Sequence, residues 1–375
     1  MDPSPVAHTQ HGGFSAHTVR LAGILAVAYL LVIVYASLQP FRGWRVPPDE
    51  ILHFLTAPWP RFITLQDVVV NVGAYVPLGL LLSIGFDTRY GPARGVAAAA
   101  GCAALLSLMM EMTQMFLPIR IASNVDLLAN TLGALVGALG ARLLAPTRAL
   151  GARLHDMRHR LFEEGMTADV GFVIVLLWLV TQFHPTAQLF GTGALRATID
   201  LPAYSAHTPL LAFASEAVVV MFNLLGIGLL LAALMRGASR PMPVIASAVG
   251  AALAVKVFTA VALLQASAPV AWFTPGVAAG LAAGWVLLFA AVRLPHPAQL
   301  AVAAVCIGIA TAAINLAPDN PYQNVPPRLL ARGASHFLSF SGIVRALSEL
   351  WPLLAVGYLA YALSRRTRDV GHNPL

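Results

Sequence analysis

Long apolar stretches, separated by shorter polar segments, dominate the pattern of hydrophobic and polar positions along this chain. Ten of them approach the roughly 20 residues that an α-helix needs to cross a bilayer. They occupy residues 21–38, 67–86, 95–117, 124–144, 169–187, 208–235, 242–264, 272–292, 298–317 and 349–364. The pattern predicts an all-α protein, a polytopic bundle of about ten transmembrane helices.

Composition supports this prediction. Hydrophobic residues make up 58 % of the chain and charged residues only 10 %, and the mean hydropathy is +0.75. A soluble domain has about 25 % charged residues, so the composition excludes an ordinary soluble globular protein. Cys102 and Cys306 fall inside separate apolar stretches. The sequence therefore predicts no disulfide, no metal site and no cofactor.

The net charge of +7 comes almost entirely from arginine, since Lys256 is the only lysine. In a membrane protein such an excess indicates orientation and lipid contact, and we expect no nucleic-acid partner. With both termini inside, 14 arginines lie on inner segments and 8 on the longer outer ones. This bias predicts an N-in, C-in protein of the bacterial cytoplasmic membrane. The polar, His-rich first twenty residues lack a cleavage signal, so we expect the first helix to be retained as an anchor.

A basic stretch over residues 146–168 is the best candidate for a linker. It would separate a four-helix membrane domain, residues 21–145, from a second unit of about six helices, residues 169–364. Residues 1–20 and 365–375 would then form cytoplasmic tails. Before the last span, Phe337, Phe340, Val344 and Leu347 recur at helical spacing, which predicts either a short helix on the outer surface or a loop folded over the bundle.

The two halves carry similar short patterns. In the second and sixth stretches an acid, Asp67 or Glu216, is followed at the same spacing by Gly-Leu-Leu-Leu, which begins at Gly79 or Gly228. The fourth and eighth stretches carry glycines four residues apart, which let helix backbones pack closely in lipid; these are Gly133, Gly137, Gly276, Gly280 and Gly284. We interpret this as a 4+4+2 arrangement of helices, with chance similarity as the alternative. Pro77 in the second stretch is the candidate kink.

Polar side chains gather at the outer ends of the second, third and fourth stretches. Residues three or four apart share one face of a helix, so each helix presents an acid and an amide together. The residues are Asp67, Asn71, Glu111, Gln114, Arg120, Asp126 and Asn130, with Arg120 in the hairpin between the third and fourth helices. Charges inside a membrane are costly, so the cluster predicts a functional site. The alternative is that these groups tie or cap helices.

Three carboxylates and one guanidinium leave a formal charge of −2 in this cluster. Arg120 can pair with one carboxylate in a bidentate geometry. The other two could be protonated, bind a cation, or receive amines or hydroxyls of a ligand. The neighbouring amides offer both donors and acceptors, which suits recognition of a sugar, a peptide or a lipid headgroup.

Three groups of polar residues, prolines and glycines follow one another in this part of the chain: Asp67, Asn71, Pro77 and Gly79; then Glu111, Gln114, Pro118 and Arg120; then Asp126, Asn130 and Gly133. Their order and spacing resemble the VanZ-like membrane family over about residues 30–145. His53, in Ile-Leu-His-Phe before the second helix, also fits that pattern. The resemblance implies a small helical membrane domain, in a family whose founding member is linked to low-level resistance to the glycopeptide teicoplanin. It leaves the last six helices unexplained.

Glu216 and Lys256 in the second half could meet as a neutral pair, with Asn223 below them. We expect this unit to be mainly structural and the first unit to carry the activity. The competing interpretation is that Lys256 faces a pore.

Our leading hypothesis is an outward-facing pocket that binds a lipid or cell-wall headgroup without hydrolysing it, because the chain has no standard hydrolase motif. The alternatives are a transporter or lipid flippase, or an enzyme that acts on a polyprenyl lipid or a phospholipid. In the enzyme, Glu111 or Asp126 would be the general base, and Arg120 or His53 would contact phosphate. Membrane lipids are the expected partners in each case, and the sequence predicts no oligomeric state.

Overall fold

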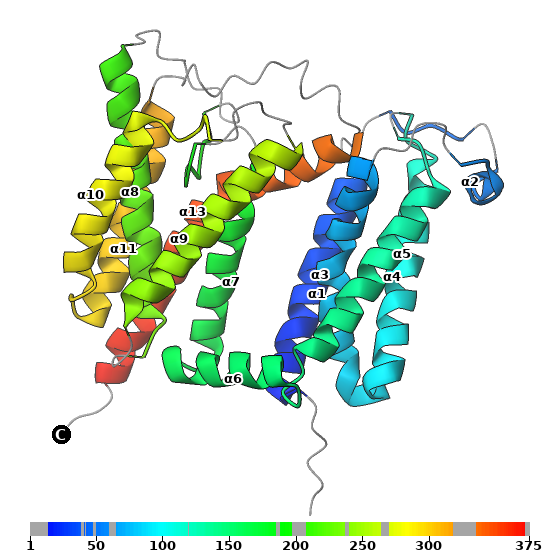
Figure 1. Ribbon diagram of the computed structural model, residues 1–375, viewed down its shortest axis with the longest axis horizontal. Coiled ribbons are helices and arrows are strands. Elements are labelled where there is room, and N and C mark those ends of the chain that lie inside the picture. The colour runs from blue at the N-terminus through cyan, green and yellow to red at the C-terminus, as the bar shows by residue number, and fades with distance from the viewer. Residues whose placement is uncertain are drawn as a thin grey trace, which may run out of the picture. The chain divides into compact units, whose positions relative to one another are not determined.

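The computed structural model describes residues 14–38, 41, 43–47, 50–59, 65–118, 120–184, 188–196, 208–236, 240–263, 270–317 and 335–371. These residues form helices and their connections, with one isolated β-bridge between Phe162 and Met235 (Figure 1). The predicted all-α class is therefore confirmed.

Ten apolar helices correspond to the ten predicted stretches. They are α1 (Ala16–Leu38), α3 (Leu65–Tyr90), α4 (Pro92–Gln114), α5 (Asn124–Leu143), α7 (Met166–Thr181), α8 (Pro209–Ala233), α9 (Pro241–Phe258), α10 (Pro275–Ala291), α11 (His296–Leu316) and α13 (Ser335–Gly371). Within the described residues, eight are long and apolar enough to cross a membrane, and α7 and α10 are shorter apolar helices. This is a polytopic helical bundle. A four-residue helix, α2 (His53–Thr56), follows α1, and a π-helical turn, Thr259–Leu263, ends α9.

Two segments differ from their predicted form. The basic linker contains a helix of its own, α6 (Ala149–Leu161), on which Leu150, Leu154 and Met157 are exposed. The residues before the last span belong to α13, which runs without a break for 37 residues with Pro352 inside it. The predicted short surface helix and the last span are thus one helix.

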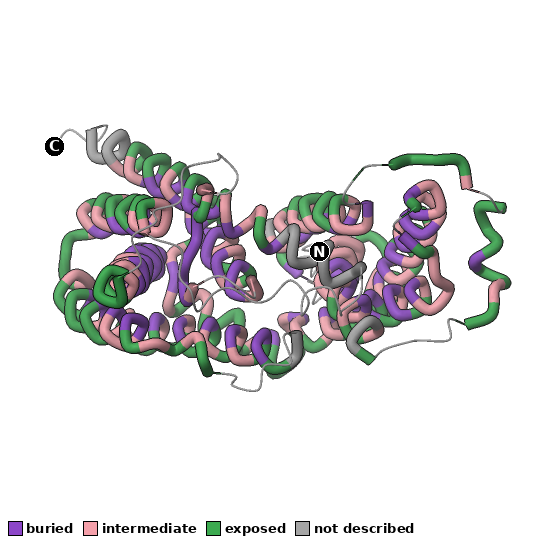
Figure 2. The backbone as a smooth tube through the Cα atoms, turned by 90° about the horizontal axis from the view of Figure 1, so that it is seen from above, coloured by how far each residue is buried: buried purple, intermediate pink, exposed green. Residues whose placement is uncertain are grey.

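The chain divides into two compact units, the first made of Met1–Arg158 and Ala334–Ser339, the second of His159–Gly333 and Phe340–Leu375. The first of the three points at which the chain passes between the units, Arg158–His159, falls inside the stretch predicted to be a linker. In each unit the buried positions lie mainly on the sides of helices that face neighbouring helices (Figure 2).

In the first unit, α3 is the central helix and packs against α1, α4 and most extensively α5. Three glycines form the α3–α5 contact: a Cβ on Gly133 would overlap the Val72 carbonyl, one on Gly137 the Val76 carbonyl, and one on Gly79 the Ala134 carbonyl. No side chain therefore separates the two backbones there, as small residues allow in membranes. This contact brings the first turns of α3 and α5 within reach of each other.

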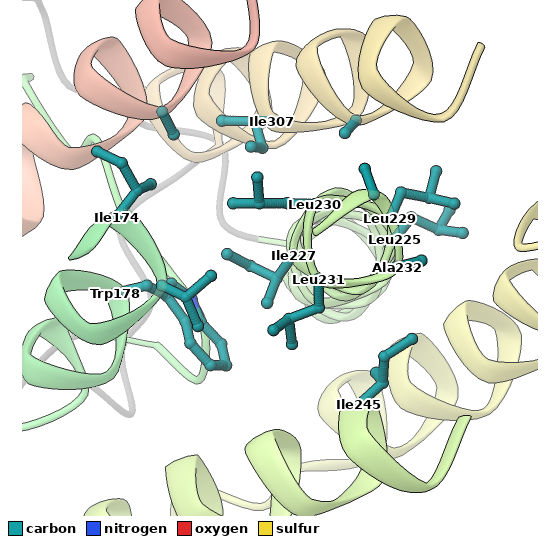
Figure 3. Packing of buried hydrophobic residues seen from close by; sticks show 14 of the residues in the cluster. Ile174, Trp178, Leu225, Ile227, Leu229, Leu230, Leu231, Ala232, Ile245 and Ile307 are labelled. Carbon is teal, nitrogen blue, oxygen red and sulfur yellow. The ribbon is translucent and has the colours of Figure 1, made fainter. Parts of the chain in front are cut away.

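In the second unit, α8 is the central helix, its second half (residues 223–233) is buried, and α10 and α11 are its main neighbours. Figure 3 shows α8 end-on, with Trp178 of α7, Ile245 of α9 and Ile307 of α11 on different sides of it. Glycines again face the central helix, because a Cβ on Gly280 would crowd the Ala217 backbone of α8. The glycine contact between α3 and α5 in the first unit thus has a counterpart between α8 and α10 in the second unit.

Residues 188–196, after α7, form an irregular segment whose central residues, 189–193, are buried in the second unit. Phe190 is fully buried and has a positive φ of 59°. The Asn315 side chain of α11 accepts hydrogen bonds from the backbone of Leu195 at 2.8 Å and donates to the Gly193 carbonyl at 2.6 Å. The Gly193 N–H donates to the Ser348 carbonyl of α13 at 2.7 Å. Such backbone is tolerated within a membrane bundle because the protein itself satisfies its polar groups.

Candidate functional site

Six of the predicted site residues form one buried polar layer in the first unit, at the end of the bundle where α1 and α4 finish and α3 and α5 begin. Each exposes between 2 % and 8 % of its surface. They are Asn71 of α3, Glu111 and Gln114 of α4, Arg120 of the following hairpin, and Asp126 and Asn130 of α5. The chain therefore brings side chains from three helices and one hairpin together, as the spacing predicts.

The link between α3 and α5 is a hydrogen bond from Asn71 Nδ2 to Asp126 Oδ1, 2.8 Å long. Asp126 lies in the first turn of α5, after the N-cap Ser123, whose hydroxyl accepts from the backbone N–H groups of Val125 and Asp126. A carboxylate in this position is stabilised by the positive end of the helix dipole. Asp126 can thus stabilise the N-terminus of α5, as predicted, and also accept the hydrogen bond from Asn71 in the polar layer.

Glu111 joins the end of α4 to the hairpin. Its Oε2 accepts the backbone N–H of Ser123 at 2.9 Å. The Arg120 guanidinium lies close enough to Glu111 for charge attraction, and its Nη2 donates to the Ala36 carbonyl of α1 at 3.1 Å. Burial lowers the pKa of Arg120, and the attraction of Glu111 opposes that shift. One acid and one base therefore hold the hairpin against α1 and α4.

Helix α1 contributes backbone acceptors to the layer. Gln114 Nε2 donates to the Ser37 carbonyl at 3.1 Å, next to the Ala36 carbonyl that Arg120 contacts. The last carbonyls of a helix have no partner within the helix, which leaves them available to such donors. The role of α1 here was not predicted, because a pattern of side chains does not reveal backbone acceptors.

Asn130 connects this polar layer to two further polar residues that lie deeper in the bundle. Asn130 Nδ2 donates to Ser107 Oγ at 2.9 Å, and Ser107 also hydrogen-bonds with Tyr75 of α3. Ser107 and Tyr75 were missed in the sequence analysis, although Ser107 lies four residues before Glu111 and Tyr75 four after Asn71. The same-face rule that grouped the other residues would have found both. We call the combined set of Asn71, Tyr75, Ser107, Glu111, Gln114, Arg120, Asp126 and Asn130 the polar network.

Two amide oxygens of the polar network have no hydrogen-bond partner among the described residues, Gln114 Oε1 and Asn130 Oδ1. Buried polar atoms in proteins are nearly always satisfied, so each oxygen calls for a donor from outside the described set. The described charges, Glu111, Asp126 and Arg120, sum formally to −1. The network is therefore suited to groups that donate hydrogen bonds.

The remaining predicted residues lie elsewhere. Asp67 is in the first turn of α3, but its side chain lies outside the described residues. His53 is exposed on α2, a helix held to α5 by a 2.9 Å hydrogen bond from Asn124 Nδ2 to the Ala57 carbonyl. The structure therefore does not bring His53 into the buried network. Among the described residues, no group of three or more His, Cys, Asp or Glu residues could hold a metal ion.

In the second unit, Glu216 and Lys256 are buried on α8 and α9. Lys256 Nζ donates to the His184 carbonyl at 2.8 Å, and Glu216 Oε2 accepts from Thr274 Oγ1 at 2.5 Å. Each thus has a partner other than the one predicted for it, and a direct Glu216–Lys256 pair stays a prediction. Asn223 lies two turns below Glu216, where its Nδ2 donates to the Val219 carbonyl of the same helix.

Comparison with known proteins identifies the first unit. Residues 14–145 match the family described as VanZ/LLP1, which confirms the resemblance inferred from the polar residues and their spacing. The match contains the whole polar network and ends before the second unit. A search of the curated proteins and a search of the solved structures each returned no match. With its membrane-length helices, the chain is a multi-pass membrane protein that contains a VanZ/LLP1 region.

Proposed function

We propose, starting from the VanZ/LLP1 match of residues 14–145, that the polar network binds the headgroup of a lipid or lipid-linked cell-wall component. We place this site on the outward side of a bacterial cytoplasmic membrane, with both termini inside. The observation that carries the proposal is the pair of buried acceptors, Gln114 Oε1 and Asn130 Oδ1, which lack a donor among the described residues.

The charge of the polar network limits the class of ligand. Two carboxylates and one guanidinium favour a headgroup that carries hydroxyl or ammonium donors, and they disfavour one that offers only anionic oxygens. The guanidinium of Arg120 already contacts the Ala36 carbonyl and lies near Glu111, so a phosphate would compete with both groups. Sugar or ethanolamine headgroups meet these conditions.

Binding alone would link this site to teicoplanin susceptibility. A protein that holds a lipid-linked wall component at the outer surface changes how much of it a glycopeptide can reach. We therefore propose a role in low-level resistance that needs no chemical step, and Glu111 and Asp126 then act as binding residues, not as general bases.

Lipid binding to the purified full chain tests the chemistry of the site. Native mass spectrometry would compare phosphatidylethanolamine and a glucosyl diacylglycerol, whose headgroups donate hydrogen bonds, with phosphatidylcholine of the same acyl chains, whose choline group does not. We expect the donor-bearing lipids to bind more tightly, by about three- to tenfold for one buried hydrogen bond.

Asn130→Leu should abolish this preference, and Asn223→Leu is the matched control. Asn223 is likewise a buried asparagine whose Oδ1 has no partner among the described residues, but it lies in the second unit. The proposal fails if wild-type protein shows no preference, or if Asn130→Leu keeps it. In cells, Glu111→Gln and Arg120→Ala would be scored for teicoplanin susceptibility at equal membrane accumulation, and unchanged susceptibility in both would refute the resistance role.

A further inference from the structure

A second feature of the first unit lies at the opposite end of the bundle from the polar network. An apolar groove of about 220 Å³ runs between the beginning of α1 and the end of α3, which are neighbouring helices (Figure 1). Val19, Gly23 and Val27 line it from α1, and Leu82, Gly85 and Phe86 line it from α3. The lining is almost wholly carbon, so a hydrocarbon is the natural occupant.

The length of the groove matches one leaflet of a bilayer. Its lining runs along α1 from Val19 to Leu30, which at 1.5 Å per residue is about 16 Å, or half of the ~30 Å hydrocarbon core. Two glycines keep it open, since a Cβ on Gly23 or on Gly85 would meet no atom within 4 Å. The space therefore fits one extended acyl chain that enters from the near membrane surface.

Two exposed arginines stand at the end of the groove nearest the membrane surface. Arg20 lies three residues before Gly23, and Arg89 three residues after Phe86, so each shares the face of its helix that borders the groove. Asp87 is the one acidic residue among the described positions 14–30 and 81–95, and it pairs with Arg142 at 2.5 Å. The mouth of the groove is therefore positively charged.

We propose that this groove binds an anionic phospholipid, with one acyl chain against Gly23 and Gly85 and its phosphate at Arg20 and Arg89. Charge complementarity selects the headgroup, because a basic residue near a membrane surface attracts anionic lipid by about 1 kcal/mol, or about fivefold in affinity. A zwitterionic lipid would fill the same groove without that gain. The site is separate from the polar network and does not depend on the function proposed for it.

The test is a titration of the purified full chain with phosphatidylmethanol, an anionic lipid whose headgroup has no hydrogen-bond donor, and with phosphatidylcholine of the same acyl chains, read by native mass spectrometry. Wild-type protein should bind phosphatidylmethanol about thirtyfold more tightly if the two arginines add. Arg20→Gln combined with Arg89→Gln should reduce that affinity to the level of phosphatidylcholine. Gly23→Leu, whose Cβ would meet no atom within 4 Å, places a side chain in the groove and should weaken both lipids.

Two matched controls should leave both affinities unchanged. Gly101→Leu adds the same side chain at an exposed glycine of α4 that also has open space around it, and Arg293→Gln removes an exposed arginine of the second unit. Asn130→Leu should likewise have no effect here, which separates this test from that of the polar network.

Equal binding of the two lipids by wild-type protein overturns the proposal. An effect of Gly23→Leu without one of the arginine pair also overturns it, because the groove would then bind chains without selecting a headgroup. An effect of the arginine pair alone overturns it as well, because the anionic lipid would then lie outside the groove.

Discussion

The glycine contact between α3 and α5 makes a sharp prediction about a single methyl group. In Gly133→Ala the new Cβ would overlap the Val72 carbonyl, and a backbone atom cannot move aside as the end of a side chain can. The two helices must separate, at a cost typical of overpacking, about 1–3 kcal/mol. Gly140→Ala, two turns further along the same helix, adds its methyl group where no atom lies within 4 Å.

Comparison of Gly133→Ala with Gly140→Ala isolates the effect of the α3–α5 contact. Both variants gain up to about 1 kcal/mol from the higher helix propensity of alanine. This gain cancels in the comparison, so the free energies of unfolding of the two variants should differ by about 1–3 kcal/mol. Reversible unfolding of the purified protein in mixed micelles would measure it. Because Val72 adjoins Asn71, Gly133→Ala should also weaken lipid binding at the polar network. Equal stability of the two variants would refute close backbone contact between α3 and α5.

Two further predictions concern ion pairs at other places in the chain. Asp87→Asn leaves the partly buried Arg142 without its 2.5 Å partner and should destabilise the protein by about 3 kcal/mol; the double variant with Arg142→Gln should lose less than the two single losses together. In the linker, the hydrogen bond from His159, together with the charge of Arg236, lowers the pKa of Glu164. Glu164 therefore stabilises the fold above its ordinary pKa and loses this effect as the pH falls through its lowered value. Unfolding midpoints of wild type and Glu164→Gln should differ at pH 6 and approach each other as the pH falls through the lowered pKa of Glu164. A difference that grows in acid would contradict this reasoning.

The ten apolar helices could be predicted because length and hydropathy suffice to recognise a membrane span. Their ends were harder to predict. The fifth stretch was predicted to reach residue 187, but α7 ends at Thr181, because apolar sequence continues into segments that the protein buries as irregular backbone. The opposite error occurred at α13, where the sequence before the last span is polar enough to suggest a separate element. Helix α6 was missed because its basic composition hides its helical spacing.

The polar network could be predicted as far as it depends on helical spacing. Asn71 and Asp126 lie on different helices, yet their register follows from two helices that enter the membrane from the same side, and the 2.8 Å hydrogen bond agrees with it. The contribution of α1 could not be predicted, because Gln114 and Arg120 contact carbonyls whose presence no side chain indicates. The exposure of His53 could not be predicted, because its resemblance to the family pattern carries no information on depth.

The irregular segment 188–196 imposes an order on the biosynthesis of this protein. Its partners Asn315 and Ser348 come 122 and more residues after Gly193 in the chain, so at about 5–20 residues per second they leave the ribosome roughly 6–30 s later. Until then the backbone of Gly193 must remain with water, or with the insertion machinery, while α1, α3, α4 and α5 of the first unit can already pack together. A stop codon between α11 and α13 should therefore yield a chain in which these four helices still pack together and the second unit is recognised by quality-control proteases.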